Sequence, residues 1–212
     1  MKTTDLIESL ALQPAAVPRS PWGLVLVAMG LTGLLLFGLG SVYGYRPELW
    51  DRMGEPWFGL NLGLLLLSAM ASLVVSCLIA VPHFSLTQRL RLFALLPFVL
   101  WSVSLAVSLV LTLATNPESI RPEPWDLFCV QNFMVFLLLP GAFFLFQIRK
   151  LAPTQPRWSS GLAVLAATSM GNFSLLLLEQ QNSIFHQIVC HWSPTMMFVL
   201  LGFCCGKKML RW

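Results

Sequence analysis

Long apolar runs separated by short polar loops make up most of this chain. A helix needs roughly 20 predominantly apolar residues to cross a bilayer, and five of the six runs reach that length. The sixth run is short unless it continues back to Ile188. The six runs cover residues 22–43, 57–81, 92–114, 125–148, 159–178 and 192–206. The pattern therefore predicts an all-α polytopic membrane protein, a bundle of six transmembrane helices.

The first 20 residues are the one segment long and polar enough to work in water. Residues 4–12 predict a short cytoplasmic amphipathic helix, because Leu6, Ile7 and Leu10 share one face at helical spacing. A helix this short is marginal alone in water. It would order by laying its apolar face in a partner's groove, or it would lie on the membrane surface. The expected domains are residues 1–20, an N-terminal binding segment, and residues 21–212, the transmembrane domain.

Composition and charge agree with a membrane protein and predict its orientation. Of the 212 residues, 57% are hydrophobic and 10% are charged, whereas soluble domains carry about 25% charged residues. Ten of the 13 basic residues lie in the N-terminal segment, the second and fourth loops and the C-terminal tail. Cytoplasmic loops carry the excess of Lys and Arg, so both termini are expected in the cytoplasm. In a bacterium the protein would then lie in the inner membrane.

Three asparagines lie inside the apolar runs: Asn61, Asn132 and Asn172. We interpret them as interhelical hydrogen-bonding groups. The alternative is a polar pathway through a small six-span transporter. No Asp, Glu, Lys or Arg lies deep in any run, which weighs against proton- or ion-coupled transport. Two Gly-x-x-x-Gly pairs would also permit close helix contact, within one chain or between copies in a homo-oligomer; they are Gly40/Gly44 and Gly59/Gly63.

Thiol and imidazole groups gather near the predicted outer face. Cys129 lies one turn into the fourth run, and Cys190 comes directly before His191. In an α-helix, His186 and Cys190 are i, i+4 neighbours and share a face. With Glu179, these side chains would form a soft metal site or a thiol switch that senses a signal. The plainer alternative is a small core cysteine with histidines at the water boundary.

Sequence motifs give no support for an enzyme. The chain has no nucleotide-binding glycine loop, no nucleophile elbow and no His-Glu-x-x-His motif. We expect no direct contact with nucleic acid and no cofactor, apart from a metal ion at the Cys/His group. A membrane thiol-redox protein that uses Cys129 and Cys190 is an alternative, but the sequence lacks the paired Cys-x-x-Cys motifs typical of that chemistry.

Five stretches occur in a characteristic order along the whole chain. They are Met1–Ile7, Tyr45–Leu49, Trp125–Cys129, Arg149–Pro156, and the C-terminal group of His186, His191, Pro194 and Gly206–Trp212. Their order and spacing resemble the NrsF-like membrane anti-sigma factors, the negative regulators of sigma-F. The resemblance covers all six predicted spans.

The resemblance implies a regulatory function. The cytoplasmic N-terminus would hold an extracytoplasmic-function (ECF) sigma factor at the membrane, away from RNA polymerase, until envelope, metal or redox stress releases it. In this reading Leu6, Ile7 and Leu10 dock into the sigma factor. Basic loop residues Arg149 and Lys150 add electrostatic contact.

One departure from the family concerns the sensor. Relatives often pair the cysteine of the fourth span with a second cysteine after the fifth span. Cys129 carries over, but Glu179 and Gln180 stand at the second position. Cys190 lies about three helical turns further on. We therefore expect Cys129, Cys190, His186 and His191 to form the sensing site. The sequence does not show whether the two cysteines pair with each other.

Overall fold

The computed structural model describes residues 21–81, 84–116, 127–151, 153–180 and 183–211. These residues form helices and no strand. Six stretches are long and apolar enough to cross a membrane, which confirms the predicted six-span fold. The crossings are α2 (Pro21–Tyr43), α4 (Pro56–Ile79), α5 (Gln88–Thr115), the run α6–η2–α7 (Leu127–Phe136, Leu137–Gly141, Ala142–Arg149), α8 (Pro156–Leu178) and the run α9–η3–α10 (Ile184–His186, Gln187–Trp192, Ser193–Met209).

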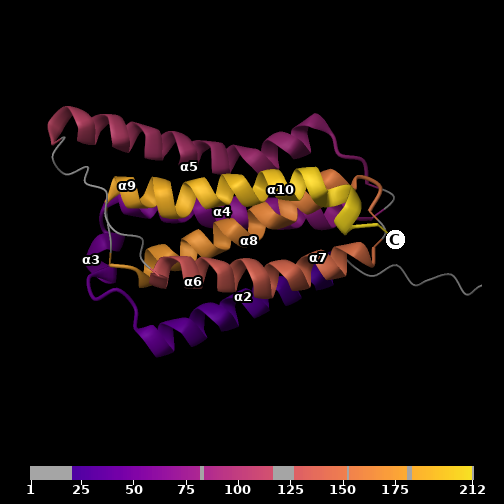
Figure 1. Ribbon diagram of the computed structural model, residues 1–212, viewed down its shortest axis with the longest axis horizontal. Coiled ribbons are helices and arrows are strands. Elements are labelled where there is room, and N and C mark those ends of the chain that lie inside the picture. The colour runs from indigo at the N-terminus through magenta and orange to yellow at the C-terminus, as the bar shows by residue number, and fades with distance from the viewer. Residues whose placement is uncertain (1–20, 82–83, 117–126, 152, 181–182, 212) are drawn as a thin grey trace, which may run out of the picture.

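Successive crossings run in opposite directions, so the bundle has two distinct ends (Figure 1). Helix α2 begins and α10 ends at the same end, where α7 also ends. We call this the basic end, because it carries Arg149, Arg157, Lys207 and Lys208. The opposite, distal end carries α9, the start of α6 and a short helix that the sequence did not predict, α3 (Leu49–Met53).

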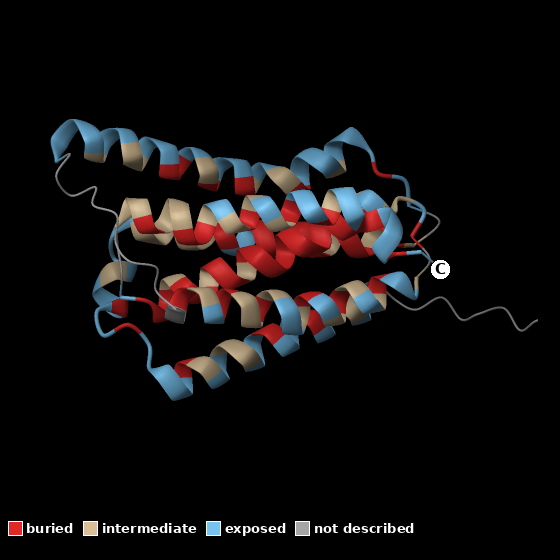
Figure 2. Ribbon diagram, in the orientation of Figure 1, coloured by how far each residue is buried: buried red, intermediate tan, exposed pale blue. Residues whose placement is uncertain are grey.

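Helix α8 is the centre of the bundle, and Figure 2 shows it buried along most of its length. It packs between α4 and α10. Its buried face is rich in Ser, Ala and Gly, whose small side chains let neighbouring helices approach closely. A Cβ added to Gly206 of α10 would lie 2.6 Å from the carbonyl oxygen of Pro156 and 2.9 Å from the Cα of Arg157. The contact between α8 and α10 therefore depends on a residue without a side chain.

Buried amides join the helices at Asn61 and Asn172, two of the three asparagines for which the sequence predicted interhelical hydrogen bonds. Ser104 Oγ of α5 donates to Asn61 Oδ1 of α4 at 2.7 Å. Asn172 Nδ2 of α8 donates to Thr195 Oγ1 of α10 at 2.8 Å. Both asparagines are buried, so these bonds satisfy groups that would be costly to leave unpaired.

Two features differ from the sequence prediction. The sixth crossing begins at Ile184 rather than near residue 192, because the π-helical turn η3 continues the helix toward the distal end. The Gly-x-x-x-Gly pairs do not bring two crossings together in the described residues. An added Cβ at Gly40 would meet the Tyr45 side chain, and one at Gly59 would lie 3.7 Å from the carbonyl oxygen of Met53 in α3. Gly63 has no atom within 4 Å of an added Cβ, and Gly44 lies beyond α2 with a φ of 81°, a value that favours glycine.

Candidate functional site

Four side chains able to bind a metal ion meet at the distal end of the bundle. Cys129 comes from α6, Glu179 directly follows α8, His186 ends α9 and His191 lies in η3. One ligand atom from each residue lies within 4.8 Å of those of the other three. Each residue is buried, with at most 4% of its surface exposed. We call these four residues the distal cluster.

The carboxylate of Glu179 is the centre of the distal cluster. Its Oε1 lies 2.7 Å from Nε2 of His186, and its Oε2 lies 2.9 Å from Nε2 of His191. Nε2 of His191 is also 3.5 Å from Sγ of Cys129. The two imidazole rings meet edge to face, with 5.4 Å between their centroids. One carboxylate thus contacts both imidazoles, and one imidazole reaches the thiol.

The environment of Glu179 favours its ionised form. Burial by itself would raise the pKa of Glu179, because a poorly solvated carboxylate is disfavoured. The contacts with His186 and His191 outweigh burial and lower the pKa from 4.5 to about 2. Glu179 is therefore a carboxylate at neutral pH, and it can accept imidazole N–H groups or bind a cation.

The π-helical turn η3 determines which side chains face Glu179. In an α-helix, Cys190 lies on the same face as His186, and His191 points elsewhere. The i→i+5 pattern of a π-helix widens the turn, so residues five apart can lie on one side. His191 therefore reaches Glu179, whereas Cys190 packs in the apolar cluster around Cys129 and is not one of the four clustered ligands.

Hydrogen bonds attach η3 to the central helix. Thr195 Oγ1 donates to the carbonyl oxygen of His191 at 2.7 Å, and Asn172 Nδ2 donates to that Thr195 hydroxyl at 2.8 Å. Asn172 and Thr195 are fully buried. The backbone position of His191 is thus linked to α8 through the hydroxyl of Thr195.

Arg46 adds a positive charge beside the distal cluster. Its backbone N–H donates to the carbonyl oxygen of Leu177 at 3.1 Å, two residues before Glu179. Burial, followed by the charge of Arg52, lowers the pKa of Arg46, whereas Glu179 acts in the opposite direction. Sequence reasoning missed a role for Arg46 here. Its one signal was its place in the Tyr45–Leu49 motif.

The residues predicted to bind a partner lie away from the distal cluster. Arg149 and Lys150 are exposed at the basic end. Arg149 Nε donates to the carbonyl oxygen of Arg211 at 2.9 Å, which joins the end of α7 to the tail after α10. The other three predicted contacts, Leu6, Ile7 and Leu10, lie outside the described residues.

Comparison with known proteins identifies the family. A family model described as NrsF, negative regulator of sigma F, matches residues 9–212. The chain belongs to the NrsF family. No curated protein and no solved structure matches this NrsF-family chain. The resemblance carried by the sequence motifs is confirmed, and the family description makes a sigma factor the regulated protein. The family description is that of a regulator.

The donor set of the distal cluster fits a four-coordinate metal ion. A thiolate, two imidazoles and a carboxylate are ligands that Zn²⁺ takes in proteins, usually in a tetrahedron. Metal–ligand distances of about 2.0–2.3 Å place the ligand atoms about 3–4 Å apart, close to the separations observed. The cluster also suits thiol chemistry, because the N–H at Nε2 of His191, which faces Glu179, lies 3.5 Å from Sγ of Cys129 and can stabilise a thiolate there.

Proposed function

We propose that this protein is a membrane-bound anti-sigma factor. Its N-terminal segment, residues 1–20, holds an ECF sigma factor at the bacterial inner membrane and releases it on an envelope, metal or redox stress signal. The family match over residues 9–212 carries this proposal. The six crossings support it, because they tether the segment to the membrane.

Charge distribution supports cytoplasmic termini. The basic end carries Arg149, Arg157, Lys207 and Lys208, and cytoplasmic ends of membrane helices are rich in such residues. In this orientation the N-terminal segment and the exposed Arg149 and Lys150 face the same compartment. The apolar face of the segment supplies the docking contact, and the basic residues attract an acidic surface of the sigma factor.

Sigma capture is tested with a promoter that the sigma factor reads. The full chain is co-expressed with an ECF sigma factor encoded next to it, and Leu10→Asp is compared with Leu12→Asp. Leu12 falls on the opposite side of an ideal helix, so it is a matched control. A charge buried at the docking face should weaken capture at least about tenfold and raise reporter output. Repression that survives Leu10→Asp at equal membrane abundance would refute the docking surface.

The distal cluster is the proposed receiver of the signal. A bound metal ion would supply positive charge that draws the thiolate, the imidazoles and Glu179 together, and it would displace the N–H protons facing the carboxylate. Oxidation of Cys129 would instead remove a thiol next to His191. Either event acts on η3, which continues into α10 and so toward the basic end.

Cysteine variants test this receiver. Cys129→Ser should abolish release of the sigma factor by zinc, cadmium or a thiol oxidant, because the soft ligand and reactive group are lost. Cys77→Ser is the matched control, since Cys77 is equally buried in a separate apolar cluster. Both variants should still repress the reporter without stress. A normal stress response from Cys129→Ser would refute the sensing role of the thiol, but it would not contradict capture of the sigma factor.

A further inference from the structure

A polar cavity of about 410 Å³ lies at the distal end, between the start of α4, the end of α5 and the segment Ser183–Gln187. We call it the distal pocket. Its volume lies within the roughly 300–1,000 Å³ typical of sites for small molecules. Its lining includes the aromatic residues Trp57 and Phe58 and the charged residues Arg52 and Glu55. An aromatic wall beside a pair of opposite charges suits a ligand with both apolar and charged parts.

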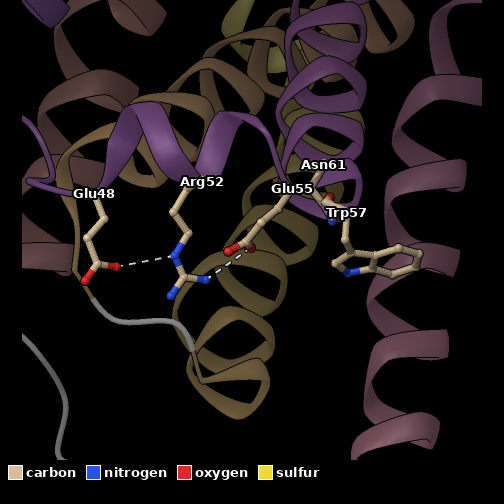
Figure 3. Close-up of polar contacts among 5 residues, drawn as sticks. All are labelled: Glu48, Arg52, Glu55, Trp57 and Asn61. Atoms are coloured by element: carbon tan, nitrogen blue, oxygen red, sulfur yellow. Dashed lines mark hydrogen bonds and ion pairs between the residues drawn. The ribbon is translucent and has the colours of Figure 1, made fainter.

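The charges of the distal pocket select against a simple anion or a simple cation. Arg52 lies between two carboxylates, with Nη1 3.3 Å from Glu55 and Nε 3.6 Å from Glu48 (Figure 3). Glu55 lines the pocket and Glu48 does not. In the pocket, an anion without a positive group would meet the carboxylate of Glu55, and a cation without a negative group would meet Arg52. A zwitterion has a partner for each of its charges.

The hydroxyl of Ser183, in the pocket wall, is available to bind a ligand. Within the described part of the chain, Ser183 Oγ is buried and has no hydrogen-bond partner. Asn61, which also lines the pocket, is already satisfied, because Nδ2 donates to the carbonyl oxygen of Trp57 at 2.8 Å and Oδ1 accepts from Ser104. Buried polar groups in proteins are normally hydrogen-bonded, so Ser183 is an open donor and acceptor in the wall.

The depth of the distal pocket places it at the membrane surface. Glu55 comes directly before α4, and Trp57 lies in the first turn of that crossing. Indole rings concentrate at the level of lipid headgroups. The outward surfaces of α4 and α5 expose Leu and Val side chains that acyl chains can cover. A ligand at this depth with a charged head and apolar tails is a phospholipid.

We propose that the distal pocket binds the phosphoethanolamine headgroup of a phospholipid. The ammonium group donates to Glu55, and the phosphate accepts from Arg52 and from the hydroxyl of Ser183. A primary ammonium has three N–H groups that can donate hydrogen bonds to a carboxylate. A trimethylammonium has no N–H group and cannot donate. This site goes beyond the proposed capture of a sigma factor. It also lies near the distal cluster, because Ile184 and Gln187, which line the pocket, flank His186 in the sequence.

Native mass spectrometry of the full chain in detergent tests the site. Phosphatidylethanolamine, phosphatidylcholine and phosphatidylglycerol with identical acyl chains are titrated separately. One phosphatidylethanolamine should bind at least about tenfold more tightly than either other lipid, as expected for hydrogen bonds to charged groups. Retention of the three lipids with equal affinity would overturn the proposal. Glycerophosphoethanolamine, the free headgroup, should bind at least about tenfold more weakly; equal affinity would overturn the assignment to a lipid.

Two carboxylates on the same arginine provide a matched pair of variants. Glu55→Gln should remove the preference for phosphatidylethanolamine, and Glu48→Gln should keep it, although both remove one negative charge beside Arg52. Ser183→Ala should weaken binding about tenfold and gives an independent test if Glu55→Gln does not fold. Equal losses in Glu55→Gln and Glu48→Gln, or unchanged binding in Ser183→Ala, would contradict the site.

Discussion

Replacing Glu179 with Gln tests whether one carboxylate holds the distal cluster together. The fall in its pKa from 4.5 to about 2 is a change of about 2.5 pH units, and each unit corresponds to about 1.4 kcal/mol. The ionised carboxylate therefore stabilises the folded state by about 3 kcal/mol at neutral pH. Gln has a similar shape but no charge, and its NH₂ group cannot accept from a second imidazole. We expect Glu179→Gln to lower the free energy of unfolding by about 2–3 kcal/mol at pH 7.

The pH dependence of this difference makes the test specific. The pKa of Glu179 is lower in the folded state, so its stabilisation is complete above the unfolded value of 4.5 and disappears as the pH falls through about 2. The difference between wild type and Glu179→Gln should therefore shrink below about pH 4.5. The difference in the free energy of unfolding is measured by unfolding both proteins in mixed micelles and following tryptophan fluorescence.

An exposed carboxylate provides the control for this experiment. Glu48 contacts Arg52 with 69% of its side chain exposed, and surface ion pairs contribute little. Glu48→Gln should change the free energy of unfolding by less than about 0.5 kcal/mol. The reasoning is refuted if Glu179→Gln behaves like Glu48→Gln at pH 7, or if its effect is the same at pH 7 and pH 3.

Two further predictions concern packing and orientation. Gly206→Ala should lower the free energy of unfolding by about 1–3 kcal/mol, because the new methyl group would meet the Pro156 carbonyl. Gly63→Ala is the control: the added methyl group has open space and should lower the free energy of unfolding by less than about 0.5 kcal/mol. Similar thermal unfolding of the two variants would contradict the close packing of α8 and α10. A cysteine introduced at Met53 should react with a membrane-impermeant maleimide from outside the cell, and one introduced at Gln155 should react only after permeabilisation; the reverse pattern would overturn the orientation.

Local chemistry in the sequence was enough to predict the six crossings. Each depends on an uninterrupted apolar run, a property of neighbouring residues that needs no knowledge of the packing. Pro56 and Pro156 also stand at the first positions of α4 and α8, where proline is tolerated because the first N–H groups of a helix have no intrahelical partner. Charge placement likewise predicted the orientation from local composition.

The distal cluster was predicted in part. Cys129, His186 and His191 were recognisable as candidate ligands, and Glu179 was noted beside them. Helical periodicity could not assign His191 to the same side as His186, because the π-helical turn between them is bound to α8 through tertiary contacts. Likewise, no local pattern brings Cys129 next to a carboxylate 50 residues away in sequence.

By itself, the sequence determined which segments cross the membrane and which chemical groups lie near each end. Only the tertiary structure decided which crossing forms the centre. Helix α8 is among the least hydrophobic of the six candidate spans, yet 78% of the residues in its most apolar 18-residue stretch are buried. In a bilayer the lipid chains are as apolar as leucine, so hydrophobicity does not distinguish the inside of a bundle from its outside. Small residues and hydrogen-bonding groups on facing helices decide which helix lies inside the bundle. Whether such residues face one another depends on which helices pack together, and that is a property of the tertiary structure.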